Sequence, residues 1–152
     1  MNLETRVTEL GLILPPAPKP AGAYTPVVFC GELALISGQI AKKSDGTVLA
    51  GRVGAGFDLA AARQAAEAAA LNSLSIMHHL IGSERIVRIL RVAGFVQTAP
   101  DFFDIPKVMD AASELFQRVL GDKGVHVRTS VGVSSLPLNT AVEIEVTLQI
   151  IS

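Results

Sequence analysis

The sequence predicts an α+β fold in which one mixed β-sheet carries two helices on one of its faces. Two observations lead to this prediction. Residues 125–134 and 141–151 alternate apolar and polar side chains, as strands with one buried face do. Two longer segments, 59–81 and 105–120, repeat apolar residues at helical spacing. Because two helices give little cover to the second face of the sheet, we expect that face to meet other subunits.

A short helix and a stiff connection precede the sheet. Asn2 is suited to cap a helix whose apolar residues Leu3, Val7 and Leu10 recur at helical spacing, and Gly11 is suited to end it. The prolines within residues 15–20 then predict an extended segment. Residues 1–20 are therefore an extension of a single domain that spans 1–152.

The hairpin and the longest helix come next. Residues 27–29 and 33–36 flank Cys30-Gly31-Glu32 and predict a β-hairpin, with Ser37-Gly38-Gln39-Ile40 at the end of its second strand. Asp58 is a good N-cap for the helix at 59–81, and Gly82 ends it. Within this helix, Arg63 and Glu67 are spaced as an ion pair.

The second half of the chain alternates strand, helix and two strands. Residues 86–96 predict a strand, and Asp101 or Asp104 caps the following helix with Pro106 tolerated in its first turn. Gly121 ends this helix. Its apolar stripe consists of Ile105, Val108, Ala112, Leu115, Phe116 and Val119. The last strand directs two sets of side chains to opposite faces: Val142, Ile144, Val146, Leu148 and Ile150 against Glu143, Glu145, Thr147 and Gln149.

The composition limits the classes of function. The chain has 152 residues, of which 49% are hydrophobic and 18% charged, so excess apolar surface is expected to be buried by self-association. A net charge of −1 without a basic stripe argues against nucleic-acid binding. No apolar run reaches the ~20 residues that a membrane span needs. A single cysteine, Cys30, and the lack of a secretory pattern in residues 1–20 predict a cytoplasmic protein.

Arg128 is the most informative residue. It shares one strand face with Ser130 and Ser134, whereas Val127, Thr129, Val131 and Val133 share the other. A permanently charged guanidinium on a sheet face needs a partner, and the planar carboxylate of a ligand would be one. The alternative is a structural ion pair at an interface. His126 lies two residues earlier and is expected to face the same way.

These residues resemble those of the YjgF/RidA family, whose members are trimers with a chorismate-mutase-like fold. Gly22-Ala23-Tyr24 is similar to the family's Gly-Pro-Tyr element, and residues 35–40 to its Ser-Gly-Gln-Ile strand end. Gly94-Phe95-Val96 with Asp101-Phe102 resembles its central strand and turn. The most specific match is the closing segment from Arg128 through Leu136-Pro137 to Glu143-Ile144-Glu145, which aligns without a gap.

The resemblance implies a reaction and a set of site residues. Arg128 would clamp a substrate carboxylate and Glu143 would position or activate water, while Tyr24, Ser37 and Ser130 would line the same cleft between subunits. The implied reaction is hydrolysis of a reactive enamine or imine, such as 2-aminoacrylate and its tautomer 2-iminopropionate, to a 2-keto acid and ammonia. Because the imine is already electrophilic, this chemistry requires neither a metal nor another cofactor.

Each of these residues also has a structural interpretation. Glu143 could pair with an arginine across the sheet, and Tyr24 could be a packing ring. Ser37 and Ser130 could satisfy backbone groups. No spacing of His, Cys, Asp and Glu predicts a metal site.

The chain also departs from the family pattern. His126-Val127 replaces the Pro-Ala that usually precedes the arginine in the deaminases, and Ser130 replaces a cysteine. The N-terminal extension and the glycine-rich residues 51–58 indicate a longer-chain branch with another substrate preference. The alternative function is a non-catalytic trimer that binds a small carboxylate. The absence of a basic surface argues against endoribonuclease activity. Chorismate mutase activity would need several cationic groups, and only Arg128 is evident.

Overall fold

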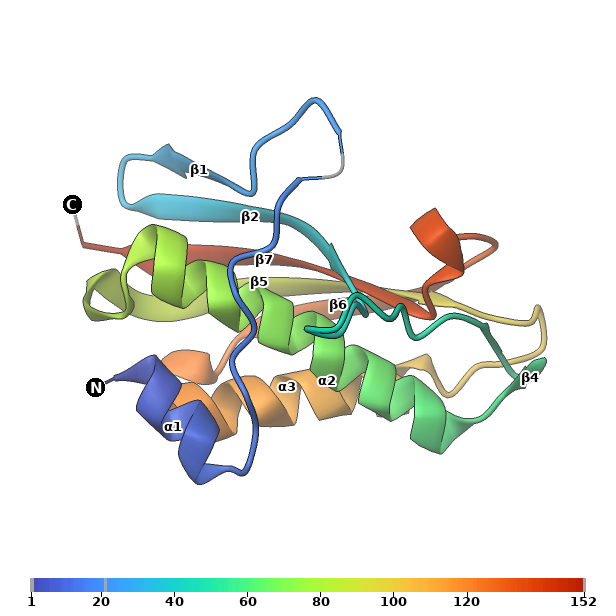
Figure 1. The fold of residues 1–152 in the computed structure, drawn as a ribbon. Helices are drawn as coiled ribbons and strands as arrows, with labels where there is room; N and C mark the ends of the chain where they lie inside the picture. The colour runs from blue at the N-terminus through green and yellow to red at the C-terminus, as the bar shows by residue number, and fades with distance from the viewer. Residues whose placement is uncertain (1, 21, 152) are drawn as a thin grey trace.

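The computed structural model describes residues 2–20 and 22–151 (Figure 1). Its centre is a five-stranded mixed sheet with the strand order β1-β2-β7-β5-β6. The strands are β1 (Val27–Cys30), β2 (Leu33–Ile40), β5 (Ile86–Gln97), β6 (Val127–Val133) and β7 (Val142–Ile150). The pair β5–β6 is parallel and the other pairs are antiparallel. The predicted mixed sheet is therefore confirmed.

Three helices lie on one side of this sheet: α1 (Leu3–Glu9), α2 (Leu59–Ile76) and α3 (Ile105–Leu120) (Figure 1). Their apolar residues and one face of the sheet form the core. In the α3 stripe, Ile105 is partly exposed and the other five predicted residues are buried. Side chains such as Ile144 and Val146 of β7 point into the core, whereas Glu145 is exposed on the open face. The predicted arrangement of helices on one face of the sheet is thus correct.

Several elements differ from the prediction. The helix expected to run to Ile81 is α-helical to Ile76 and continues as a π-helical turn, Met77–Ile81, which ends at Gly82 with a φ of 95°. Two short strands, β3 (Arg52–Val53) and β4 (Gly56–Phe57), pair within the glycine-rich residues 51–58, for which the sequence predicted no strand. Short 3-10 turns at Ser83–Arg85, Gly121–Gly124 and Pro137–Asn139 complete the chain.

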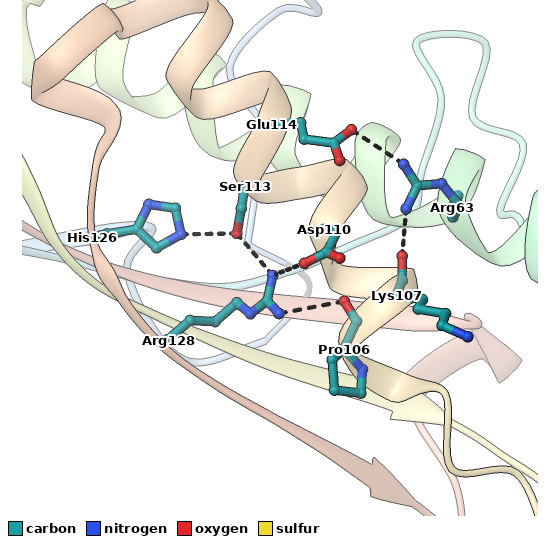
Figure 2. Close-up of polar contacts among 8 residues, drawn as sticks. All are labelled: Arg63, Pro106, Lys107, Asp110, Ser113, Glu114, His126 and Arg128. Carbon is teal, nitrogen blue, oxygen red and sulfur yellow. Dashed lines mark hydrogen bonds and ion pairs between the residues drawn. The ribbon is translucent and has the colours of Figure 1, made fainter.

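The predicted pair between Arg63 and Glu67 is replaced by contacts between the two long helices. Arg63 lies on α2, and its Nη2 is 3.1 Å from the Glu114 carboxylate on α3. Its Nη1 donates to the carbonyl oxygen of Lys107 (Figure 2). The prediction was wrong because helical spacing reports only the neighbours within one helix, and α3 offers both a carboxylate and a helix carbonyl.

The N-terminal extension is anchored at both ends. The Asn2 side chain accepts hydrogen bonds from the amides of Glu4 (3.0 Å) and Thr5 (3.4 Å), so it caps α1 as predicted. Arg6 of α1 donates to the Arg118 carbonyl of α3. Residues 15–20 then pass over α2 toward the β1–β2 edge (Figure 1). The buried Ser75 hydroxyl of α2 donates to the Pro15 carbonyl at 2.6 Å. Among the described residues, no helix is long and apolar enough to cross a membrane.

Candidate functional site

A pocket of about 620 Å³ opens at the edge of the sheet, where β2 extends beyond the short β1. The proline-rich residues 15–20 form one wall, and residues 37–40 and 42–46 form others. Three of the predicted site residues, Tyr24, Ser37 and Glu143, line this pocket together. Tyr24 is half-exposed. These three residues come from separate parts of the sequence, so their convergence is a result of the fold.

The backbone of β2 is distorted where it enters the pocket. The register between β2 and β7 shifts between Ile36 and Gln39, which makes Ser37 and Gly38 a bulge. The buried Gln39 side chain donates to the Ser37 carbonyl at 3.0 Å and to the Ser37 hydroxyl at 3.3 Å. Beyond the bulge, the Asn72 amide donates to the carbonyls of Ile40 and Lys42. The hydrogen bonds of Gln39 and Asn72 therefore fix the polar wall of the pocket at and beyond the bulge.

Gly38 allows the Glu143 carboxyl group to lie against this bulge. A Cβ atom at position 38 would be 3.0 Å from the carboxyl carbon of Glu143 and would overlap one of its oxygens. Burial raises the pKa of Glu143, and the nearby negative charge of Glu145 raises it further. Glu143 forms no ion pair in the described part of the chain, so the pairing with an arginine across the sheet is not realised within one chain.

Arg128 lies on β6 and points toward α3, as Figure 2 shows. Its Nη1 donates to Asp110 Oδ1 at 2.9 Å and to Ser113 Oγ at 3.1 Å, and its Nη2 donates to the Pro106 carbonyl at 3.3 Å. A guanidinium has five N–H groups, and these contacts use three. The N–H of Nε and the second N–H of Nη2 are left, and together they can bind a carboxylate through two hydrogen bonds. An ion pair of Arg128 is thus present within the chain, and two N–H groups of its guanidinium have no hydrogen-bond partner in the described part of the chain.

His126 faces the same way as Arg128, as predicted. Its Nε2 is 2.9 Å from the Ser113 hydroxyl, and its Nδ1 is 2.6 Å from the Gly124 carbonyl oxygen. Burial lowers the pKa of His126; the Gly124 carbonyl partly opposes this, and the Arg128 charge lowers the pKa further. The imidazole ring also packs edge-on against Phe116.

Three neighbours of Arg128 were not identified from the sequence: Pro106, Asp110 and Ser113. Asp110 and Ser113 are three residues apart, so they lie on one side of α3 next to its buried stripe. That spacing was the only available signal. It does not reveal that this side of α3 packs beside β6, because their contact joins residues 15 to 22 positions apart.

The chain does not bring Arg128 and Glu143 together. Arg128 is paired with Val92 of β5, whose side chain points into the helix-covered core, whereas Glu143 is paired with Phe95, three residues further on. Residues an odd number apart on a strand project from opposite faces. Ser130 follows Arg128 on the helix side, and its hydroxyl is buried without a hydrogen-bond partner in the described part of the chain. Arg128 and Ser130 are absent from the pocket lined by Glu143.

The described residues contain no group of three or more His, Cys, Asp and Glu side chains that could hold a metal ion. Cys30, on the short β1, is exposed.

The helices on one face of a mixed sheet and the pocket at the sheet edge place the protein in the chorismate-mutase-like class of α+β folds. A family model described as "YjgF/chorismate_mutase-like, putative endoribonuclease" matches residues 4–148. The chain belongs to this YjgF family.

Similar proteins support the same assignment over almost the whole chain. Protein TCP17 of Trypanosoma cruzi is 34% identical over 98% of this chain and 94% of its own length. The structure of protein Atu1372 from Agrobacterium tumefaciens is 38% identical, covers 99% of this chain and 94% of its own, and superposes with a TM-score of 0.87. The structure of "a putative endoribonuclease" from Shewanella oneidensis is 26% identical over 98% of this chain and 99% of its own, with a TM-score of 0.91.

Proposed function

We propose that this protein hydrolyses reactive enamines or imines of small 2-amino acids to 2-keto acids and ammonia, in clefts between the subunits of a homotrimer. The observation that carries the proposal is the convergence of Tyr24, Ser37 and Glu143 on one pocket. Membership of the YjgF family and the carboxylate-binding edge left on Arg128 support it.

The two faces of the sheet are the reason for proposing an assembly. A substrate held by Arg128 and attacked by water next to Glu143 needs both residues, yet they project from opposite faces of one chain. Two copies can satisfy this requirement if Arg128 from the β6 edge of one copy approaches the pocket at the β2 edge of another. Edge-to-edge contacts of this kind are heterologous, and three copies related by rotation close into a ring.

The chemistry needs orientation and one proton relay. Arg128 would bind the substrate carboxylate through two parallel hydrogen bonds and thereby place the imine carbon near Glu143. Glu143 would accept a proton as water adds to that carbon, and a proton would pass to the nitrogen. The C–N bond then breaks, so one water and one imine yield a 2-keto acid and ammonia. A raised pKa suits Glu143 to this exchange because its carboxyl group then gives and takes protons nearer neutral pH.

The test is release of pyruvate from enzymatically generated 2-aminoacrylate, measured for the wild type, Arg128→Ala and Glu143→Gln. We expect the wild type to accelerate hydrolysis, and loss of the carboxylate clamp to reduce kcat/KM by about 100-fold or more, as for other charged hydrogen bonds to a substrate. Glu143→Gln should reduce kcat more than it raises KM.

The main alternative is a non-catalytic trimer that binds a small carboxylate. The departures from the pattern of the family's deaminases at His126-Val127 and Ser130 support this alternative. It predicts that pyruvate stabilises the wild type against heat but not Arg128→Ala, with no acceleration of hydrolysis by either. That combination would reject the deaminase. Endoribonuclease activity, named in the family description, has no support from the net charge of −1.

A further inference from the structure

We propose that Ser113 and His126 form a positioning relay that orients the Arg128 guanidinium for a substrate carboxylate. The proposal rests on the proposed function, because it assigns a role to residues around its clamp. Neither residue would touch the substrate. They would act through Arg128, with Asp110 and Pro106 as the other supports (Figure 2).

The directions of the hydrogen bonds follow from one carbonyl group. The Gly124 carbonyl can only accept, so the His126 nitrogen next to it, Nδ1, carries a proton. In the neutral ring Nε2 then has a lone pair and accepts the hydroxyl proton of Ser113. The Ser113 oxygen is left with its lone pairs directed away from His126, and it accepts from Arg128 Nη1. The backbone at Gly124 thereby determines which way the hydroxyl group points.

This arrangement fixes one end of the guanidinium. The two N–H groups of Nη1 are matched by two acceptors, Asp110 and Ser113, and the Pro106 carbonyl accepts from Nη2. Because the guanidinium is planar, holding these donors also sets the direction of the remaining edge, Nε and Nη2. An arginine that is ordered before binding loses less conformational entropy when a carboxylate arrives.

The relay depends on a neutral His126. Burial lowers the pKa of His126, the Gly124 carbonyl partly opposes this, and the adjacent Arg128 charge lowers the pKa further, so the net shift favours the uncharged imidazole. The family's deaminases usually have Pro-Ala in place of His126-Val127, and neither of those residues has a side-chain hydrogen-bonding group. The relay is thus a feature of this chain's own sequence.

The experiment measures KM and kcat for 2-aminoacrylate hydrolysis, together with the calorimetric Kd for pyruvate, in the wild type, four single variants, the double variant Ser113→Ala/His126→Phe and Arg128→Ala. Ser113→Ala removes the acceptor of the Arg128 bond, and Ser113→Thr keeps it. His126→Phe keeps a ring against Phe116 and removes both ring nitrogens. Ser83→Ala is the matched control, because its hydroxyl lies 2.9 Å from His78, in a Ser–His pair remote from Arg128. Thermal unfolding checks that each variant is folded.

We expect Ser113→Ala to raise KM and Kd about tenfold with little change in kcat, as loss of one hydrogen bond to a charged group predicts. Ser113→Thr should restore both, and Ser83→Ala should change neither. His126→Phe should weaken binding in the same direction but add nothing to Ser113→Ala, because the imidazole acts only through that hydroxyl.

Two results would overturn the relay. One is an unchanged KM and Kd in Ser113→Ala while Arg128→Ala loses binding; the clamp of the proposed function would then stand without the relay. The other is full additivity of His126→Phe and Ser113→Ala, which indicates separate structural effects. If Arg128→Ala itself binds pyruvate as the wild type does, the proposed function fails together with the relay.

Discussion

Glu143 is the residue whose protonation matters most to the proposed chemistry. Its carboxyl group lies against Gly38 and shares the open face of β7 with Glu145, two residues away. Burial and this like charge both favour the neutral form and raise the pKa. The folded protein therefore holds the Glu143 proton at pH values where the unfolded chain, with an ordinary glutamate pKa of about 4.3, has released it.

This difference predicts a pH dependence of stability. Because the folded pKa is the higher one, ionised Glu143 destabilises the fold, and the loss develops as pH rises from the unfolded pKa through the folded pKa. Glu143→Gln removes the charge. The difference in free energy of unfolding between this variant and the wild type should therefore shift in favour of the variant over the same pH interval, and stay constant at higher pH. Urea unfolding across a pH series measures the difference.

Glu145→Gln is the control for the cause of the shift. It removes the neighbouring charge and leaves the burial of Glu143 intact. The folded pKa of Glu143, which is the upper end of the pH interval, should therefore fall part of the way back toward the ordinary glutamate value. A stability difference between Glu143→Gln and wild type that stays constant with pH would contradict the raised pKa.

At the scale of the elements, local periodicity was sufficient where one face of an element is buried. It placed β7, β5 and α3 to within one or two residues, and it put Arg128 and His126 on one side of β6. It could not place β3 and β4, which are too short to show a period. Nor could it show that Arg128 faces α3 while Glu143 faces away, because this depends on the parallel and antiparallel registers of β5 with its two neighbours.

The wall of the pocket formed by residues 15–20 receives a side-chain hydrogen bond from Ser75 of α2, a contact that the sequence alone does not indicate. Both Ser75 and the Pro15 carbonyl that it contacts are buried. Ser75→Ala would leave that carbonyl without its donor, at a cost of about 1–3 kcal/mol. We expect lower stability in urea unfolding and faster cleavage of the segment 12–20 in limited proteolysis.

Ser73→Ala provides a matched comparison for this contact. Ser73 is equally buried two residues earlier in α2, but its hydroxyl donates to the Ala69 carbonyl within the same helix. Its removal should leave the rate of cleavage within residues 12–20 unchanged. Equal effects of the two substitutions on that rate would show that the Ser75 bond does not hold the wall.

At the scale of the whole molecule, the open face of the sheet is the surface that one chain leaves incomplete. Val127 is 69% exposed and Val131 40% exposed on β6, and Leu35 is 45% exposed on β2. These apolar side chains lie on the face opposite the helices, beside Glu143 and Glu145. Burial of such a face against further copies would accompany the meeting of the β6 edge with the β2 edge.

Complementation between inactive subunits tests whether the proposed site is shared. Arg128→Ala chains keep Glu143, and Glu143→Gln chains keep Arg128, so a mixed trimer contains clefts in which both residues are intact. Random assembly from equal amounts of the two variants makes about one quarter of the clefts complete, given one Arg128 and one Glu143 from different copies. We expect deaminase activity near that fraction of the wild type, from particles whose mass by light scattering is three times 15.9 kDa.

Mixing either variant with the double variant Arg128→Ala/Glu143→Gln leaves each cleft incomplete and should restore no activity. If the two single variants remain inactive after verified mixing, the cleft does not combine Arg128 and Glu143 from different copies, and their separation on opposite faces of the sheet would have to be explained without a shared site.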